Sequence, residues 1–172
     1  MSPIVTLTIG LAALILYFAA FWVLQRAIGN SAVEDVGWAM SVGLVGLFYC
    51  AVGAGDISQR GLLAVLILSW ATRLSLHLYR RWCQHPEDER YTALKEKWGD
   101  QAQFRMFRFY QLQAVVAFIF MWPLLVVANL NSPLGGLDSF AIVVWVISIV
   151  GEALSDLPVS YTHLTLPTTP YV

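Results

Sequence analysis

Residues 2–25 read SPIVTLTIGLAALILYFAAFWVLQ, and this run contains no charged side chain. A helix rises about 1.5 Å per residue, so about 20 apolar residues are enough to cross the hydrocarbon core of a bilayer. The run therefore predicts a transmembrane helix. It is not preceded by the basic residues that are typical of a signal peptide, so we expect this helix to be retained.

Four more apolar runs follow, and together they predict an all-α, polytopic membrane helix bundle of about five transmembrane helices. The composition agrees, since 58% of the residues are hydrophobic and 12% are charged, whereas soluble domains carry about 25% charged residues. Pro123 predicts a kink that neighbouring helices must accommodate. The predicted spans are 2–25, 36–55, 61–79, 109–130 and 140–157.

The basic residues predict the orientation of the bundle. Seven of the ten lysines and arginines fall between Arg80 and Arg108, and short basic loops stay in the cytoplasm. We therefore expect residues 80–108 on the cytoplasmic side and the N-terminus outside. The fifth span would then end on the cytoplasmic side.

The basic loop is expected to be partly helical. Pro86 is followed by three acidic residues, which is typical of a helix start, and Gly99 is a plausible stop. Residues 104–110 alternate arginine with aromatic side chains. They could lie at the membrane surface or form a solvated connector, and the sequence leaves both open.

Arg73 is the most informative ionisable residue. It follows twelve uncharged residues, so it lies about 18 Å into its span. An ionisable group at that depth costs on the order of 2.5 kcal/mol or more unless it has a partner or a wet cavity. His77 and Arg80 follow on the same helix face. We take Arg73 and His77 as candidate catalytic residues.

The fifth predicted span carries acidic residues that could complement this basic face. Glu152 and Asp156 are four residues apart and share a helix face. We expect Arg73 or His77 to lie near Glu152, which is a third candidate catalytic residue, in a shared interior cavity. The alternative is a snorkelling Arg73 and two interfacial acids.

Other polar residues have simpler interpretations. Asp35, just before the second predicted span, suits a helix N-cap. Trp38 is typical of an interfacial anchor. One of Gln111 and Gln113 is expected to face the bundle, because lipid offers an amide no partner. We find no metal-ligand motif, and the net charge of −1 gives no indication of a nucleic-acid partner.

The end of the chain does not resemble a membrane protein. Residues 159–168 read VSYTHLTLPT, which matches one reading frame of a transposon-type sequencing adapter. We therefore interpret 158–172 as an artefactual tail and exclude it from fold reasoning. Residues 1–157 are then the transmembrane domain, and we expect the gene product to continue beyond it.

Several short motifs in a fixed order carry a family resemblance over residues 33–157. With these motifs the chain resembles bacterial membrane proteins of the DUF1295 family, which belongs with the steroid 5α-reductase C-terminal superfamily. The motifs are Asp35-Val-Gly-Trp38, Trp70-Ala-Thr-Arg73-Leu-Ser-Leu-His77-Leu-Tyr-Arg80-Arg81, Glu87-Asp88-Glu89-Arg90-Tyr91, Trp98-Gly99, Tyr110-Gln111-Leu-Gln113 and Gly151-Glu152-Ala-Leu-Ser-Asp156-Leu157.

The resemblance implies a multi-pass protein of the bacterial inner membrane that contacts NADPH at its cytoplasmic end. The family continues with a further helix and a marked segment that binds the cofactor, which implies that this chain is truncated before that segment and is inactive alone. The candidate cofactor contacts within the chain are Arg80, Asp88, Arg90, Tyr91 and Asp156.

Three functions remain open at this point. The first is an NADPH-dependent oxidoreductase that reduces an activated double bond of a lipid or steroid-like substrate taken from the bilayer. The second is a methyltransferase of the isoprenylcysteine carboxyl methyltransferase type, which would use S-adenosylmethionine. The third is a non-enzymatic membrane protein whose charged residues only pack helices.

Overall fold

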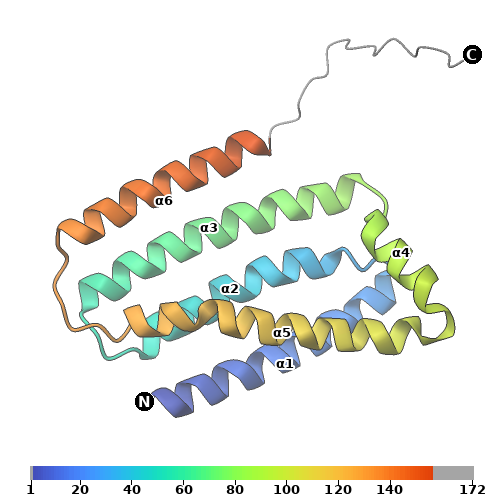
Figure 1. Ribbon diagram of the computed structural model, residues 1–172, viewed down its shortest axis with the longest axis horizontal. Helices are drawn as coiled ribbons and strands as arrows, with labels where there is room; N and C mark the ends of the chain where they lie inside the picture. The colour runs from blue at the N-terminus through green and yellow to red at the C-terminus, as the bar shows by residue number, and fades with distance from the viewer. Residues whose placement is uncertain (1, 157–172) are drawn as a thin grey trace, which may run out of the picture. The chain divides into compact units, whose positions relative to one another are not determined.

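The computed structural model describes residues 2–156, and every regular element in that range is a helix (Figure 1). The described residues form two compact units, residues 2–134 and 135–156, and the expected tail lies outside the described residues. The helices are α1 Pro3–Ile28, α2 Val33–Val52, α3 Ile57–Gln84, α4 Glu89–Trp98, the 3-10 helix η1 Gly99–Gln101, α5 Ala102–Val127 and α6 Gly136–Ser155.

Five helices are long and apolar enough to cross a membrane, which confirms the predicted polytopic bundle. They are α1, α2, α3, α6 and the span within residues 89–127 that contains α5. The third and fourth spans differ most from their predicted lengths. The third span extends from Ile57 to Gln84, and α5 begins at Ala102, so residues 104–110 form the first turns of that helix. Pro123 lies inside α5.

Polar side chains and glycines define the helix ends in the way that the backbone requires. Ser2 caps α1, and Asp56 caps α3 by accepting hydrogen bonds from the backbone N–H groups of residues 58 and 59. Gly29 ends α1 with a φ of 72°, which is a left-handed conformation that glycine adopts without strain.

The first unit is organised around α2, which packs against α1, α3 and α5 (Figure 1). Two glycines allow the close approach of α3. A Cβ at Gly43 would lie 2.7 Å from the Cβ of Ala71, and one at Gly46 would lie 2.9 Å from Ile67 Cγ2. Helix pairs in membranes use small residues in this way, because close backbones gain van der Waals contact. Large side chains fill the rest of this core, namely Leu14, Phe18, Tyr49, Met106, Tyr110 and Met121.

The turn between α2 and α3 is hydrogen-bonded to the chain that leaves α5. The backbone N–H of Gly55 donates to the carbonyl oxygen of Ala128 at 3.1 Å, and that of Asp56 donates to the carbonyl oxygen of Leu130 at 2.9 Å. The side chain of Asn129 accepts from the N–H of Ala54 at 3.1 Å. A Cβ at Gly53 would lie 2.3 Å from the Ala128 oxygen, so this turn requires glycine there. We call these contacts the outer clasp.

The predicted N-cap role of Asp35 is wrong. Helix α2 begins at Val33, and the residue at its N-cap is Ala32, which has no capping side chain. Asp35 lies in the first turn, and its carboxyl is used by another helix instead. Its partners lie on α4, as described below.

The second unit contains α6. The backbone N–H of Gly135 donates to Asp138 Oδ2 at 2.7 Å, so an acidic residue in the first turn holds the start of this helix. Glu152 and Asp156 lie at the opposite end of the helix.

Candidate active site

The first turn of α2 meets α4 through a buried tyrosine. Tyr91 is 3% exposed, and Glu34 is 1% exposed. The hydroxyl oxygen of Tyr91 lies 2.7 Å from Glu34 Oε2 and 2.9 Å from Asp35 Oδ1. We call these three residues the carboxyl–tyrosine cluster.

The cluster has more acceptors than protons. A phenol carries one proton and can donate it to only one of the two carboxyl groups, while an ionised carboxyl can only accept. Both short contacts are hydrogen bonds at the same time when one carboxyl is protonated and donates to the Tyr91 oxygen. The geometry is therefore suited to holding one proton in addition to that of the tyrosine.

The second oxygen of Glu34, Oε1, is buried without a hydrogen-bond partner among residues 2–156. A buried polar atom without a partner costs about 1–3 kcal/mol, so such atoms point to a functional contact. Glu34 lines a cavity of about 330 Å³, the inner cavity, together with Trp38, Leu78 and Gln113. Gln113 thus faces the bundle, as expected for one of the two glutamines.

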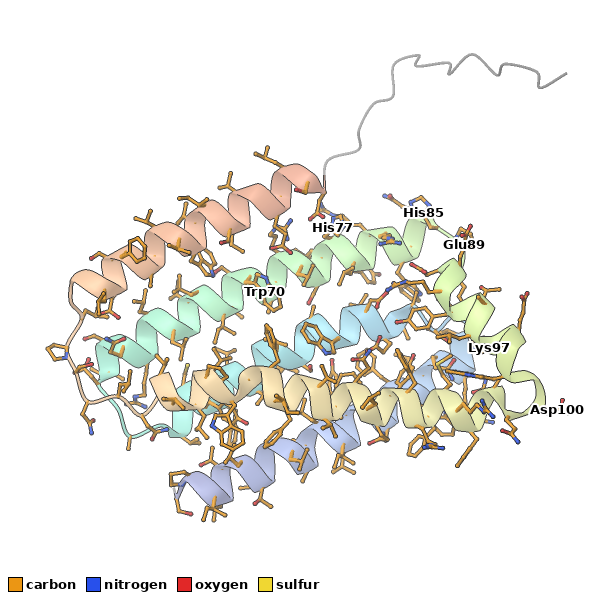
Figure 2. All side chains as sticks on the ribbon, viewed as in Figure 1. Trp70, His77, His85, Glu89, Lys97 and Asp100 are labelled. Carbon is orange, nitrogen blue, oxygen red and sulfur yellow. The ribbon has the colours of Figure 1, made fainter. Side chains whose placement is uncertain are left out.

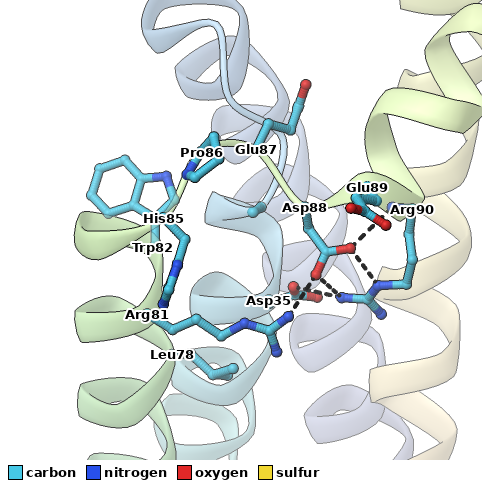
Figure 3. A pocket seen from close by; sticks show the side chains of 11 residues that line it. Asp35, Leu78, Arg81, Trp82, His85, Pro86, Glu87, Asp88, Glu89 and Arg90 are labelled. Atoms are coloured by element: carbon cyan, nitrogen blue, oxygen red, sulfur yellow. Dashed lines mark hydrogen bonds and ion pairs between the residues drawn. The ribbon is translucent and has the colours of Figure 1, made fainter. Parts of the chain in front are cut away.

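Arg90 connects the carboxyl–tyrosine cluster to a network of ion pairs at the start of α4. Its guanidinium donates to Asp35 Oδ2 at 3.1 Å and to Asp88 Oδ1 at 2.9 Å (Figure 3). Arg81, from the last turn of α3, donates to Asp88 Oδ2 at 2.9 Å. Asp88 also caps α4 by accepting from the N–H of Arg90. The hydrogen bond from the Arg90 side chain is the main reason that the pKa of Asp88 lies below its usual value, and the charge of Arg81 adds to it.

The same residues border a larger cavity of about 550 Å³, the α3–α4 cavity (Figure 3). It lies beside the inner cavity, because both are lined by Asp35, Leu78, Arg81 and Arg90. Trp82 belongs to its lining, and the indole Nε1–H of that residue is buried without a partner in the described part of the chain. The carboxyl–tyrosine cluster therefore adjoins both cavities, because Asp35 lines the α3–α4 cavity and the inner cavity.

Carboxylates outnumber guanidinium groups around the α3–α4 cavity. Its lining includes Asp35, Glu87, Asp88 and Glu89 against Arg81 and Arg90. Both arginines are already bound to carboxylates, and Glu87 is paired with Lys95 at 2.6 Å. The described residues thus make a polar cavity with an excess of carboxylates rather than a basic one.

A further layer of hydrogen bonds fixes the chain that leads into α2. The backbone N–H of Ser31 donates to Glu87 Oε1 at 2.6 Å, and Tyr110 donates to the carbonyl oxygen of Ser31 at 3.1 Å. Gln25 accepts from the Ser31 hydroxyl and donates to Gln103 on α5, both at 3.0 Å. Buried networks of this kind hold side chains in one arrangement.

The structure brings three of the predicted cofactor residues together, namely Asp88, Arg90 and Tyr91. Arg80 is exposed and lines neither the α3–α4 cavity nor the inner cavity. Asp156 belongs to the second unit.

None of the three candidate catalytic residues is among the residues that line the α3–α4 cavity or the inner cavity. Arg73 and His77 are half-buried on α3, five residues and one residue before Leu78, which lines both cavities. Figure 2 labels His77 on this helix. Glu152 lies in the second unit, so its proximity to Arg73 or His77 stays a prediction.

Glu34 was missed by sequence reasoning. The predicted second span starts at residue 36 with Asp35 as its boundary, which leaves Glu34 outside the span. The available signal was an acidic pair adjoining a long uncharged run, since ionisable residues within a span are functional candidates by default.

A family model described as "Protein of unknown function (DUF1295)" matches residues 21–162, which is more than half of the chain. The chain belongs to the DUF1295 family. No curated protein and no solved structure matched it. The DUF1295 match confirms the resemblance and spans the carboxyl–tyrosine cluster, both cavities and α6.

Proposed function

We propose that this DUF1295 protein is a membrane reductase that saturates an activated carbon–carbon double bond of an apolar, lipid- or steroid-like substrate, with NADPH as the reductant. The observation that carries the proposal is the buried Glu34 carboxyl, which is bonded through Oε2 to Tyr91, has an Oε1 unpartnered among the described residues and belongs to a residue that lines the inner cavity. This is the arrangement expected of an acid held ready for a substrate oxygen.

The described residues suit part of NADPH. The carboxylates around the α3–α4 cavity are acceptors for ribose hydroxyls, and the Trp82 N–H is a free donor. The phosphates fit less well, because Arg81 and Arg90 are already paired with carboxylates. We therefore assign the hydroxyl- and amide-bearing part of the cofactor to this cavity. NADPH, when bound, would supply a hydride to the double bond.

Glu34 would supply the other half of the reduction. Hydride addition to a double bond conjugated to a carbonyl places negative charge on the carbonyl oxygen. A protonated Glu34 donating from Oε1 would stabilise that charge and protonate the enolate oxygen, and the resulting enol would tautomerise to the saturated carbonyl compound. Burial strengthens this interaction, because a low dielectric weakens electrostatics less than water does.

Tyr91 and Asp35 would return the proton to Glu34. Asp35 borders both cavities and contacts the Tyr91 hydroxyl, which in turn contacts Glu34. A proton taken up by Asp35 would reach Glu34 Oε2 by two coupled transfers, from Asp35 to the phenol oxygen and from the phenol to Glu34, and rotation of the carboxyl would then present it to the substrate. Arg90 holds Asp35 in place for this transfer.

The inner cavity suits the carbonyl end of an apolar substrate. Most of its lining is polar, with Glu34, Asp35, Arg81, Arg90 and Gln113 beside the indole of Trp38 and the side chain of Leu78. Such placed polar groups would orient a substrate carbonyl next to Glu34. We propose the apolar remainder of the substrate from the helices that suit a lipid bilayer.

The test is a Glu34→Gln substitution in the protein reconstituted in lipid. Gln keeps the shape and the hydrogen bond to Tyr91 but has no acidic proton. We expect the rate of NADPH oxidation with an α,β-unsaturated ketone to fall by about 10²-fold or more, while NADPH binding stays within about twofold.

The matched control is Glu96→Gln on α4, which is exposed and lines none of the cavities described above. It should leave turnover unchanged. Equal turnover of the Glu34→Gln variant and the parent protein would overturn the proposal. Binding of S-adenosylmethionine in place of NADPH would favour the methyltransferase.

A further inference from the structure

A third cavity of about 560 Å³ lies along the N-terminal part of α5. It shares no lining residue with the α3–α4 cavity or the inner cavity, so it is not part of the site described above. It includes Trp98 from the end of α4 and Gln101 from η1, and the remaining lining comes from α5. We call it the α5 cavity.

The charge of the α5 cavity is opposite in character to that of the α3–α4 cavity. Its lining contains Arg105 and Arg108 and no carboxylate. Neither arginine forms an ion pair with a carboxylate in the part of the chain that the structure describes. The one side-chain hydrogen bond of Arg105 goes to the neutral amide of Gln101, at 3.1 Å. The cavity therefore presents two cationic groups that no described anion neutralises.

An apolar path leads away from these charges along the same face of α5. Phe104 is 64% exposed and Leu112 is 58% exposed, and both line the cavity. Leu112 lies one turn beyond Arg108, or about 6 Å further along the helix. Val116 and Ile119 continue this face at intervals of four and three residues and are also exposed.

We propose that the α5 cavity binds the headgroup of an anionic phospholipid. The phosphate would lie against Arg105 and Arg108, because guanidinium groups bind phosphate oxygens with paired hydrogen bonds. The acyl chains would follow the exposed face that begins at Leu112. The aromatic rings of Trp98 and Phe104 suit the boundary between headgroup and hydrocarbon. This site does not depend on the proposed reductase activity.

The experiment measures lipid binding to the full chain in detergent by native mass spectrometry. The probes are phosphatidylglycerol and the zwitterionic phosphatidylcholine, each titrated separately. The parent protein should retain one phosphatidylglycerol in preference to phosphatidylcholine. Each arginine strengthens binding to an anionic lipid by about fivefold, so the Arg105→Gln/Arg108→Gln variant should bind phosphatidylglycerol about 25-fold more weakly.

The charge-matched control is Arg80→Gln/Lys97→Gln, because both residues are exposed and lie outside the α5 cavity. It should bind phosphatidylglycerol as the parent protein does. An equal loss in the control would overturn the proposal by showing attraction to diffuse charge. Equal binding of the two lipids, or displacement of phosphatidylglycerol by inorganic phosphate, would also overturn the proposal. If the double variant does not fold, Arg108→Gln alone should weaken binding by about fivefold.

Discussion

Tyr91 is the residue on which the candidate site depends most directly. Its hydroxyl is the one group that contacts both Glu34 and Asp35. These contacts join α4, which lies outside the apolar spans by composition, to the first turn of a helix at the centre of the bundle. Removing that hydroxyl leaves the carboxyl groups of Glu34 and Asp35 without the hydrogen-bond partner that they share.

We therefore expect Tyr91→Phe to lower reductase turnover by about 10²-fold or more. It should also lower the free energy of unfolding by about 1–3 kcal/mol, because Glu34 loses its hydrogen-bond partner. Turnover is measured by NADPH oxidation, and stability by thermal unfolding in detergent. The control is Tyr110→Phe, another fully buried tyrosine, whose hydroxyl binds only the Ser31 carbonyl. Its turnover should stay within a few-fold of the parent; a comparable loss would remove the special role of Tyr91.

The sequence identifies ionisable residues more easily than it identifies their partners. Asp88, Arg90 and Tyr91 are close in sequence, so a family motif could single them out together. Glu34 and Tyr91 are 57 positions apart, and no local pattern connects them. Asp35 was assigned to an N-cap because capping is a local property, whereas its partners Tyr91 and Arg90 come from a distant helix.

At the scale of elements, the start of α4 depends on one carboxylate with two tasks. Asp88 caps the helix and also binds Arg81 and Arg90. Asparagine can still cap a helix but cannot form the ion pairs, whereas alanine does neither. The two tasks can therefore be separated by substitution.

Asp88→Asn should lower the free energy of unfolding by about 1 kcal/mol or less, since exposed arginines gain little from ion pairs. Asp88→Ala should cost about 1 kcal/mol more through the lost cap. The pKa of Asp88 is lower in the folded protein than its usual 3.8, so its ionised form stabilises the fold above that pH. The difference between parent and Asp88→Asn should hold from pH 7 to about 4 and disappear at lower pH. A difference that grew on acidification would contradict this account.

The contact between α2 and α3 depends on a missing side chain. The Cβ that alanine would add at Gly43 meets the Cβ of Ala71 at 2.7 Å, and neither atom can rotate away. Gly43→Ala should therefore lower the free energy of unfolding by about 1–3 kcal/mol. The control is Gly61→Ala on α3, where a Cβ meets nothing within 4 Å and stability should rise by up to about 1 kcal/mol. Both variants are measured by thermal unfolding. If the two substitutions changed the free energy of unfolding equally, helix propensity rather than the contact with Ala71 would explain the effect.

Helices are predicted well where composition determines them and less well at their ends. The apolar runs predict all five spans, and Pro86 to Gly99 predicts α4, whose C-cap is Gly99. The start of α5 was placed too late, because the arginines at 105 and 108 interrupt the apolar pattern. A helix continues through such residues when its backbone bonds are satisfied, whatever the side chains contact.

At the scale of the whole molecule, the two cysteines provide a test of the predicted orientation. Cys83 is exposed and lies within the segment expected in the cytoplasm, whereas Cys50 is buried. A membrane-impermeant maleimide should label Cys83 only after cells are permeabilised, and Cys83→Ser should abolish that labelling. The readout is the mass added to the purified protein. Labelling of Cys83 on intact cells would show that residues 80–108 lie outside the cytoplasm, which is the opposite of the predicted orientation.

The number of spans could be predicted from sequence, but their arrangement could not. Hydropathy is a property of each segment alone, and lipid-facing and buried surfaces of these helices are similarly apolar. The packing of α2 against α1, α3 and α5 depends instead on shape, at residues such as Gly43 and Gly46. The candidate site lies where that arrangement brings α2, α3 and α4 together, so it could not be located before the packing was known.

The outer clasp has a consequence for how the protein is made. The N–H groups of residues 54–56 find their acceptors on residues 128–130, which the ribosome adds more than seventy positions later. In a nascent chain that has inserted only its first three spans, these N–H groups can donate only to water. Delivery of α5 across the bilayer is thus the event that closes this turn, and a chain stalled before it should be an early substrate for membrane quality-control proteases.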